Sequence, residues 1–264
     1  MKRTVIALVA FALCMGATLA RADWDQGDPY KWVQLPDPNG WDVNVTAVEI
    51  LADDFLCSET GWITDIHFWG SWKNGGVGTI DSIYLNIHED VPAGQDPDRP
   101  YSHPGDVLWS RVLDPATYGG VVIREWGTGQ QGWYDPATGE YSPDDHFETW
   151  QVNVFLDRAD WFLQQGSPNE PTVYWLGTTV VVSPIGPQFG WKTSQSHWND
   201  DAVSGIWFGP AHGQPQWGQD LHDPITGETL DLAFVITGAP IPEPGAYALI
   251  GTGLLGMLAL RRWK

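Results

Sequence analysis

The sequence predicts an all-β fold, an antiparallel β-sandwich of jelly-roll type. Short segments of β-branched and aromatic residues recur along the chain, and turns that use its 20 prolines and 30 glycines separate them. In residues 80–88, IDSIYLNIH, apolar and polar side chains alternate with the two-residue period of a half-buried strand. Helical patterns are scarce, so a two-sheet fold is favoured over a mixed one.

Ten segments have the composition and period of strands. The longest, TVYWLGTTVVV, is expected at the centre of a sheet because it is largely apolar on both faces. An irregular lead-in is expected at residues 23–43, and one short helix at Arg158–Gly166, where Asp160 lies near the start and Gly166 can end it. The ten segments are residues 44–51, 62–69, 80–88, 107–113, 121–126, 150–157, 172–182, 189–194, 205–209 and 230–238.

Two similar hexapeptides, DPATGE at Asp135–Glu140 and DPITGE at Asp223–Glu228, predict tight turns. An Asp side chain accepts a hydrogen bond at the first position, Pro presets the next φ, and Gly tolerates a left-handed conformation. The alternative is a repeated metal-binding loop. Turn chemistry explains the same residues more simply.

The first 22 residues have the order of a secretory signal peptide. Lys2 and Arg3 precede an apolar run, and Ala20-Arg21-Ala22 supplies small residues for cleavage after Ala22. The alternative, a membrane-spanning anchor, needs about 20 apolar residues, and this run is shorter. The body, residues 23–240, shows no linker or shift in composition and is expected to be a single domain.

Residues 241–264 combine a Pro-Glu-Pro triplet, an apolar run and a basic tip. Basic residues after an uncharged apolar run mark the side of a membrane that stays in the cytoplasm. The body would then face outward, which agrees with the signal peptide. An ordinary tail helix of the domain is the alternative, and the clustered basic residues argue against it.

The body is strongly acidic. Between residues 23 and 241 there are seven Lys and Arg residues against 32 Asp and Glu residues, a net charge of −25. Nucleic acid is therefore excluded as a partner, because phosphate binding needs positive charge. Cys57 is the one cysteine outside the signal peptide, so it can form neither an intramolecular disulfide nor a thiolate zinc site, and we expect a buried free thiol.

Acidic charge in an exported protein serves solubility, or it binds calcium, which prefers oxygen ligands. Two acidic pairs are the candidates for calcium: Asp53-Asp54, and the pair inside HWNDD, which also contains Asn199. A hydrogen-bonded loop is the alternative for each pair. The candidate calcium ligands are Asp53, Asp54, Asn199, Asp200 and Asp201.

Seventeen tryptophans give the chain many flat aromatic faces. Most are expected in the core, but exposed Trp rings are the usual platform for sugar rings. Packing in the core is the alternative for every one of them. The candidates for ligand binding are Trp69, Trp72, Trp126, Trp133 and Trp198.

No catalytic motif is present. The chain contains no G-x-S-x-G, no H-E-x-x-H, no phosphate-binding loop and no dinucleotide fingerprint. A retaining glycosidase would need two carboxylates about 5 Å apart across a cleft, and no strand offers such an array. We therefore expect a non-enzymatic protein without a cofactor other than calcium, and a jelly-roll glycoside hydrolase ranks third among the functions.

The C-terminal segment resembles the PEP-CTERM sorting signal of bacteria that make extracellular polysaccharide. The resemblance rests on Pro242-Glu243-Pro244, the apolar run, and Arg261-Arg262. It implies recognition by a membrane enzyme of the exosortase type, transient membrane attachment through the apolar helix, and delivery to the cell envelope, surface or extracellular matrix.

The body resembles a domain of unknown function that recurs in exported bacterial proteins with such C-terminal signals. The resemblance covers most of residues 30–238 and rests on stretches in the same order, among them ADDFLCSETGWITDIHFWGSW and GWKTSQSHWNDDAV. It implies a β-rich fold and brings no activity with it. Within these stretches, the blocks ADDF, WGSW and HWNDDAV are where a site is expected. We favour a surface or matrix protein that binds polysaccharide. A purely structural envelope protein with calcium in its loops is the second hypothesis.

Overall fold

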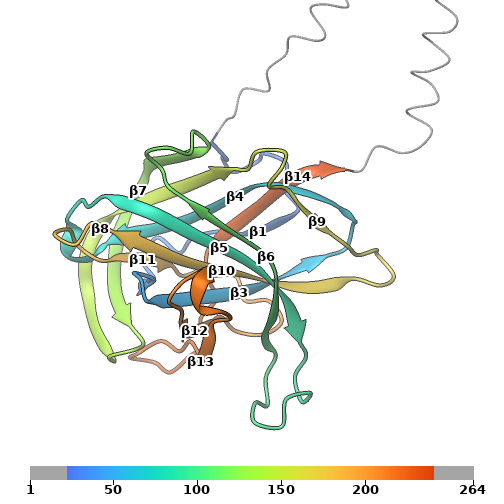
Figure 1. Ribbon diagram of the computed structural model, residues 1–264. Coiled ribbons are helices and arrows are strands. Elements are labelled where there is room, and N and C mark those ends of the chain that lie inside the picture. Colours follow the sequence, from blue (N-terminus) through green and yellow to red (C-terminus); the bar gives the residue numbers. More distant parts are fainter. Residues whose placement is uncertain (1–22, 241–264) are drawn as a thin grey trace, which may run out of the picture.

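The computed structural model describes residues 23–240, and these form two β-sheets packed face to face (Figure 1). The eight-stranded sheet contains β1 (Trp32–Gln34), β2 (Trp41–Asn44), β4 (Gly61–Trp72), β7 (Val121–Asp135), β8 (Glu140–Phe155), β9 (Phe162–Gln164), β11 (Phe189–Lys192) and β14 (Phe234–Pro240). The six-stranded sheet contains β3 (Glu49–Cys57), β5 (Ile80–Val91), β6 (His103–Leu113), β10 (Thr172–Val182), β12 (Val203–Ile206) and β13 (Gln216–Asp220). The prediction of an all-β protein with two sheets is confirmed.

The apolar core lies between the two sheets. The alternation predicted for residues 80–88 is confirmed, since Ile83, Leu85 and Ile87 of β5 are fully buried. Ile66 and Phe68 of β4 meet them from the other sheet. Strand β10 lies between β3 and β5, so the longest apolar segment is central, as predicted.

Five strands of the eight-stranded sheet close into a ring, in the order β4, β11, β2, β7 and β8. The ring closes because β8 pairs with β7 along one edge and with β4 along the other, from Asp65↔Phe155 to Gly70↔Trp150. One pairing in it, β2 with β7, is parallel. The jelly-roll order is therefore not established, and the sandwich is not purely antiparallel.

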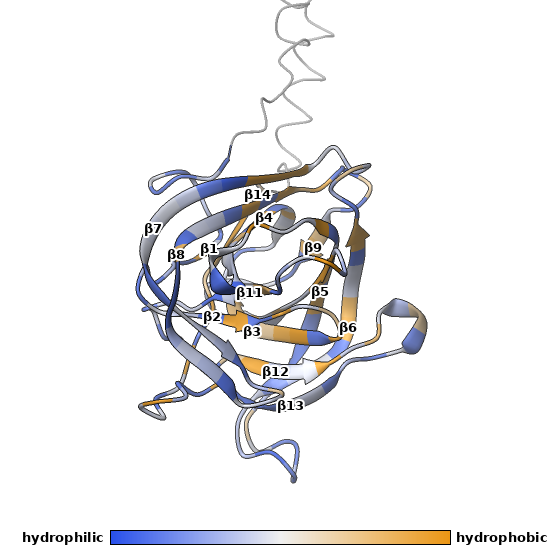
Figure 2. Cartoon of the chain, turned by 90° about the vertical axis from the view of Figure 1, so that its left-hand side faces the viewer, coloured by the Kyte–Doolittle hydropathy of each residue, from blue (hydrophilic) through white to orange (hydrophobic). Residues whose placement is uncertain are grey.

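Many polar side chains are buried inside this ring. Residues that alternate with the core-facing ones point into it: Ser71 of β4 donates to Oε1 of Gln131 at 3.2 Å, and Thr149 donates to the same atom at 3.0 Å. His67 Nδ1 lies 2.7 Å from Oδ1 of Asn153. Figure 2 shows the long strands β7 and β8 mostly in hydrophilic colours, in contrast to β3 and β14. The domain thus has an apolar interior between its sheets, and inside the ring a second interior in which polar side chains lie beside Trp69 and Trp133.

The predicted helix at Arg158–Gly166 is wrong. Residues 157–160 form a turn in which Asp160 N donates to Asp157 O at 2.7 Å, and Phe162–Gln164 form β9, paired with β4. A nine-residue helix is marginal on its own. An extended backbone here gains hydrogen bonds to β4, and it packs Phe162 against the core. Within residues 23–240 the only helical turns are the 3-10 segments η1 (Lys73–Gly75) and η2 (Pro210–His212).

Both hexapeptides form the predicted turns. Gly139 N donates to Asp135 O at 2.8 Å and Gly227 N to Asp223 O at 2.9 Å, and both glycines have φ near +75°, at +72° and +77°. The predicted strand over residues 44–51 is interrupted, because the chain passes there from β2 in one sheet to β3 in the other. Strands β1, β9 and β13 lie outside the predicted segments. The lead-in expected to be irregular at residues 23–43 is wrong in part, since β1 and most of β2 lie within it and pair with β14, β7 and β11. Cys57 is a buried free thiol, as expected.

Replacing Ile87 by Ala tests the position of the core. Ile87 is fully buried, so the substitution is expected to lower the free energy of unfolding by about 2–5 kcal/mol. Ile185→Ala is the matched control, since Ile185 is 99% exposed and the change there is expected to cost less than about 0.5 kcal/mol. Denaturant unfolding measures both, and equal losses would contradict the assigned core.

Candidate functional site

An acidic cluster forms where β3 meets two loop segments of the chain. Strand β12 pairs with β3 in the register Val203↔Ala52, so the HWNDD loop that leads into β12 continues alongside Asp53 and Asp54. The segment before β14 brings in Asp231 from the other side. The structure therefore brings the two predicted acidic pairs together, although about 145 positions separate Asp54 from Asn199.

Asp54 lies at the centre of the cluster and is fully buried. Its Oδ2 accepts a hydrogen bond from Asn199 Nδ2 at 2.5 Å and a longer one from Asp200 N at 3.5 Å. Its other oxygen, Oδ1, is buried without a hydrogen-bond partner. A buried polar atom without a partner is costly, so this oxygen marks a place where a cation or water fits.

Asp53 points to the opposite face of β3, and the amide of Gln34 links it to Asp231. Asp53 Oδ2 accepts from Leu232 N at 2.6 Å and from Gln34 Nε2 at 3.1 Å, and the same Nε2 lies 3.4 Å from Asp231 Oδ2. Hydrogen bonds from the backbone and from Gln34 therefore already occupy the carboxylate of Asp53. This residue positions its neighbours and does not offer its carboxylate to a ligand.

Asp231 and His197 belong to the site, although neither is among the predicted calcium ligands; His197 is part of the predicted HWNDD motif, whereas Asp231 was not predicted. Trp198 N donates to Asp231 Oδ2 at 2.8 Å, and His197 Nδ1 lies 3.4 Å from Asp231 Oδ1. Potential ligand atoms of His197, Asp201 and Asp231 all lie within 4.8 Å of one another. The sequence does contain a signal for Asp231: it is an acidic residue inside the apolar run LDLAF. A carboxylate at such a position is buried and needs hydrogen-bonding partners.

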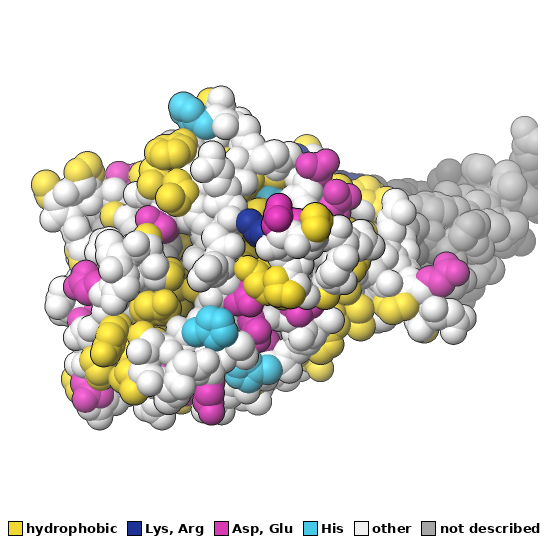
Figure 3. All heavy atoms as spheres, turned by 90° about the horizontal axis from the view of Figure 1, so that it is seen from below, with side chains coloured by type: hydrophobic (Ala, Val, Ile, Leu, Met, Phe, Trp, Pro, Cys, Tyr) yellow, Lys and Arg dark blue, Asp and Glu magenta, His cyan; other side chains and the backbone are white. Residues whose placement is uncertain are grey.

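The electrostatics of the cluster show a deficit of positive charge. Burial raises the pKa of Asp54 to about 8, against hydrogen bonds from Asn199 and Asp200 that lower it. Burial also raises the pKa of Asp231 to about 6 and that of Asp53 well above its ordinary value, and the neighbouring carboxylates add to the shift of Asp53. No Lys or Arg within residues 23–240 pairs with these carboxylates. On the face seen in Figure 3, carboxylates are likewise spread widely and basic side chains are sparse.

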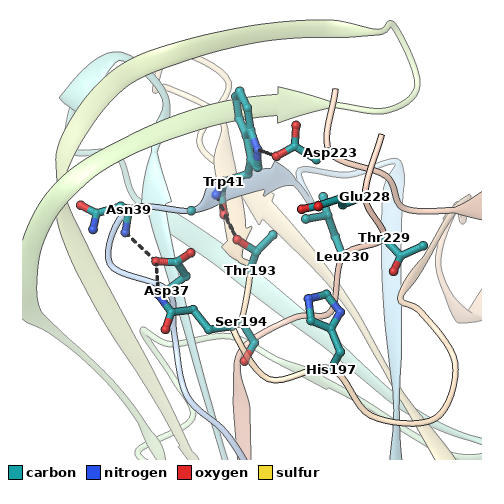
Figure 4. Close-up of a pocket in the computed structure, with 12 residues that line it drawn as sticks. Asp37, Asn39, Trp41, Thr193, Ser194, His197, Asp223, Glu228, Thr229 and Leu230 are labelled. Carbon is teal, nitrogen blue, oxygen red and sulfur yellow. Dashed lines mark hydrogen bonds between the residues drawn. The ribbon is translucent and has the colours of Figure 1, made fainter. Parts of the chain in front are cut away.

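A polar pocket of about 300 Å³ lies beside the cluster and shares His197 with it. Figure 4 shows Asp37 and Asn39 on one side of this pocket and Asp223 and Glu228 on the other. Trp41 stands in its wall, and its Nε1 donates to Asp223 Oδ2 at 2.8 Å. The carboxylate of Asp223 accepts hydrogen bonds from this indole and from backbone amides of its own turn. Burial acts to raise the pKa of Asp223, but these hydrogen bonds have the larger effect and lower it.

Three of the five tryptophans predicted to bind ligand are buried. Trp69, Trp72 and Trp133 are at most 3% exposed, so core side chains cover their faces. Trp198 is half-buried and packs edge-on against Trp32, with ring centroids 4.9 Å apart. Trp126, at 39% exposed, is the only exposed tryptophan among the described residues, and its ring meets the edge of Trp69.

The predicted targeting segments lie outside the described residues. This applies to the signal peptide, residues 1–22, and to the sorting residues Pro242, Glu243, Pro244, Arg261 and Arg262. Within residues 23–240, the structure contains no helix of the length and apolarity needed to cross a membrane.

Comparison with known proteins identifies both parts of the chain. The PEP-CTERM protein-sorting motif matches residues 240–262, so the chain carries the mark of an exported protein that an exosortase processes. Neither the curated proteins nor the solved structures contain a match. The family described as Domain of unknown function (DUF7901) matches residues 30–237, most of the chain, and the protein therefore belongs to this family.

Proposed function

We propose that the exported domain is a non-catalytic, calcium-binding structural module of the cell surface. The observation that carries this proposal is the buried, unpartnered Oδ1 of Asp54 among carboxylates whose pKa values are raised. A bound cation supplies the missing positive charge and a partner for that oxygen.

The ligand set favours calcium over other cations. Asp201 and Asp231 have carboxylate oxygens within 4.8 Å of each other and of a His197 nitrogen. Asp54 and Asp200 lie beside them around Asn199, whose amide oxygen joins the set if its side chain turns over. Calcium takes six to eight oxygen ligands, which suits this composition. Transition metals prefer nitrogen or sulfur, and His197 is the one nitrogen ligand of the cluster.

The pocket beside the cluster supports the non-catalytic part of the proposal. A general acid needs a raised pKa, whereas the pKa of Asp223 is lowered and its oxygens bind Trp41 and the backbone of the turn. The carboxyl groups whose pKa values burial raises most, those of Asp53, Asp54 and Asp231, lie in the cluster rather than across the pocket.

Calcium is expected to raise the melting temperature of the full-length chain. At 100 times its Kd, a ligand adds about 2.7 kcal/mol, which corresponds to roughly 5–10 °C for a protein of this size. Asp54→Asn and Asp231→Asn are expected to lose most of this shift. Asp144→Asn is the matched control, because Asp144 is exposed and its φ of 57° suits Asn.

Thermal melts in EDTA, calcium, zinc and manganese distinguish the outcomes. A shift with zinc or manganese alone would contradict the calcium proposal and would assign the site to a transition metal held by His197. No shift with any of the three cations would contradict metal binding by the cluster.

Without calcium, stability is expected to fall as pH rises. Asp54 has an ordinary pKa of 3.8 and a folded-state pKa of about 8, so the folded state binds more protons than the unfolded state between these values. Stability from this group is therefore complete below about pH 4 and is lost up to about pH 8. In EDTA we expect the melting temperature to drop between pH 5 and 8.5, with a smaller drop for Asp54→Asn than for Asp144→Asn. An equal drop in both variants would show that Asp54 does not cause it.

A second candidate function, polysaccharide binding, is favoured by Trp126. This residue is unpaired at a bulge in β7, where the register with β8 shifts between Glu125 and Gly127. Bulges re-aim side chains, and here an aromatic ring is presented to solvent. The exosortase route, linked to polysaccharide-producing bacteria, supports the same function.

Retention on immobilised polysaccharides tests the second function. Trp126→Ala is expected to weaken saturable binding by about tenfold, since stacking of one ring is worth about 1–2 kcal/mol. Phe208→Ala, which removes an aromatic ring that is 61% exposed elsewhere, is the control. Unchanged retention of the Trp126 variant, or no retention of the wild type, would remove this function from consideration.

A further inference from the structure

A buried lysine, a buried aspartate and a histidine meet inside the closed ring of strands. Asp42 of β2 and Lys192 of β11 are direct partners in the antiparallel register, and both are fully buried. His146 reaches them from β8, with its side chain 1% exposed. These three groups belong neither to the acidic cluster nor to the pocket.

One carboxylate oxygen receives both basic groups. Lys192 Nζ lies 2.7 Å from Oδ2 of Asp42, and His146 Nε2 lies 2.8 Å from the same atom. The other ring nitrogen of His146, Nδ1, lies 3.0 Å from Asp145 Oδ2, which fixes the imidazole. Oδ1 of Asp42 is buried without a hydrogen-bond partner. The amine is therefore hydrogen-bonded to an oxygen of the carboxyl group, and an imidazole that can carry a proton binds the same oxygen.

Buried side chains and backbone surround Asp42 and Lys192 and exclude water from them. The ring of Trp133, fully buried, flanks Asp42 from β7, where the two residues are register partners. Gly190 leaves room for Asp42 and for the Trp133 ring, since a Cβ there would lie 2.8 Å from Cβ of Asp42 and 3.0 Å from that ring. A charged pair in such a place is a weak source of stability, because its desolvation costs as much as its attraction returns.

The protonation tendencies fit a reaction between the two side chains. Burial lowers the pKa of Lys192, against the attraction of Asp42. Burial also acts to lower the pKa of His146, but its bonds to Asp42 and Asp145 outweigh it and raise that pKa. The amine thus loses its proton more readily than an exposed lysine, while the imidazole holds one that it can donate.

We propose that Lys192 and Asp42 condense into an intramolecular amide, an isopeptide bond, with His146 as the proton carrier. A proton passes from the ammonium to the carboxylate across their hydrogen bond, which leaves a neutral amine and a neutral carboxylic acid. The lone pair of Nζ attacks Cγ and forms the N–C bond. His146 donates a proton to the departing hydroxyl, the C–O bond breaks, and water leaves. His146 then takes the surplus proton from Nζ and returns to its initial state.

The reaction needs no oxidant or co-reactant, because an ammonium and a carboxylate give an amide and one water. It joins residues 150 positions apart and fastens β2 to β11 covalently within the ring. A cross-link over so long a loop restricts the unfolded chain strongly. The described residues hold a single cysteine, Cys57, and so cannot form a disulfide among themselves. The proposed amide supplies the covalent cross-link that disulfides supply in other exported domains.

Peptide mapping by mass spectrometry of the full-length chain, recovered from the cells that make it, tests the proposal. Trypsin would release Trp32–Lys73 and Ala159–Lys192 as separate linear peptides if the pair were only ionic. The cross-link predicts that both disappear. In their place we expect one joined product. It contains Trp32–Lys73 and a longer peptide that starts at Ala159 and continues past the uncleaved Lys192, and its mass is about 18 Da below the summed masses of these two joined peptides. Dehydration of an aspartate alone also removes one water, but it leaves the two peptides separate.

Variants assign the roles of the residues. Lys192→Arg keeps the positive charge and is expected to abolish the joined peptide. His146→Gln is expected to slow its appearance after refolding by about 100-fold, as loss of a general acid–base does. Lys73→Arg, which keeps the exposed ion pair with Glu140, is expected to retain the joined peptide. Tryptic release of linear Ala159–Lys192 from the wild-type chain would overturn the proposal, and this measurement does not depend on whether any variant folds.

Discussion

The closure of five strands into a ring is the constraint on which the rest of this structure depends. Strand β4 takes part in it twice, because it pairs with β11 through residues 70–72 and with β8 through residues 65–70. All residues of β4 from 66 to 72 are buried, on both faces of the strand. Side chains that alternation would place in water, such as Ser71 and His67, are enclosed and must find partners among themselves.

This constraint explains why a highly acidic chain buries so many polar groups. The charge of −20 for the whole chain is not simply a solvated surface. Asp42, Asp53, Asp54 and Asp231 are inside, and each is held in a different way: by a lysine and a histidine, by backbone amides, by the Asn199 loop, or by the Trp198 backbone. Where a basic partner is present the network is balanced. Where none is present, as at Asp54, the pKa rises and the site is suited to a cation.

The tryptophans show how far composition leads and where it stops. The number of tryptophans indicated either a large aromatic core or a sugar-binding face. The burial of each ring in the structure shows which of these uses is open to it. Trp69 and Trp133 lie in the enclosed interior of the ring, whereas Trp126, which a bulge leaves unpaired in β7, is partly exposed and contacts Trp69 with its ring. Alternation along a strand predicts which side chains share a face. It does not predict which faces are covered, because coverage depends on strands far away in the sequence.

Local sequence was enough to predict the export route, the all-β class, the central strand at 172–182, the two Asp-Pro turns and the buried Cys57, since each depends on local chemistry or on a contiguous motif. The two acidic pairs were also visible in it. The contacts of Asp54 with Asn199, the approach of His197 and Asp231, and the pairing of Lys192 with Asp42 arise from the folded arrangement alone. These residues come together through strand pairings that span 145 to 150 positions or more, and local sequence carries no record of such register. The helix expected at 158–166 failed for the same reason, because pairing with β4 outweighed a weak local preference.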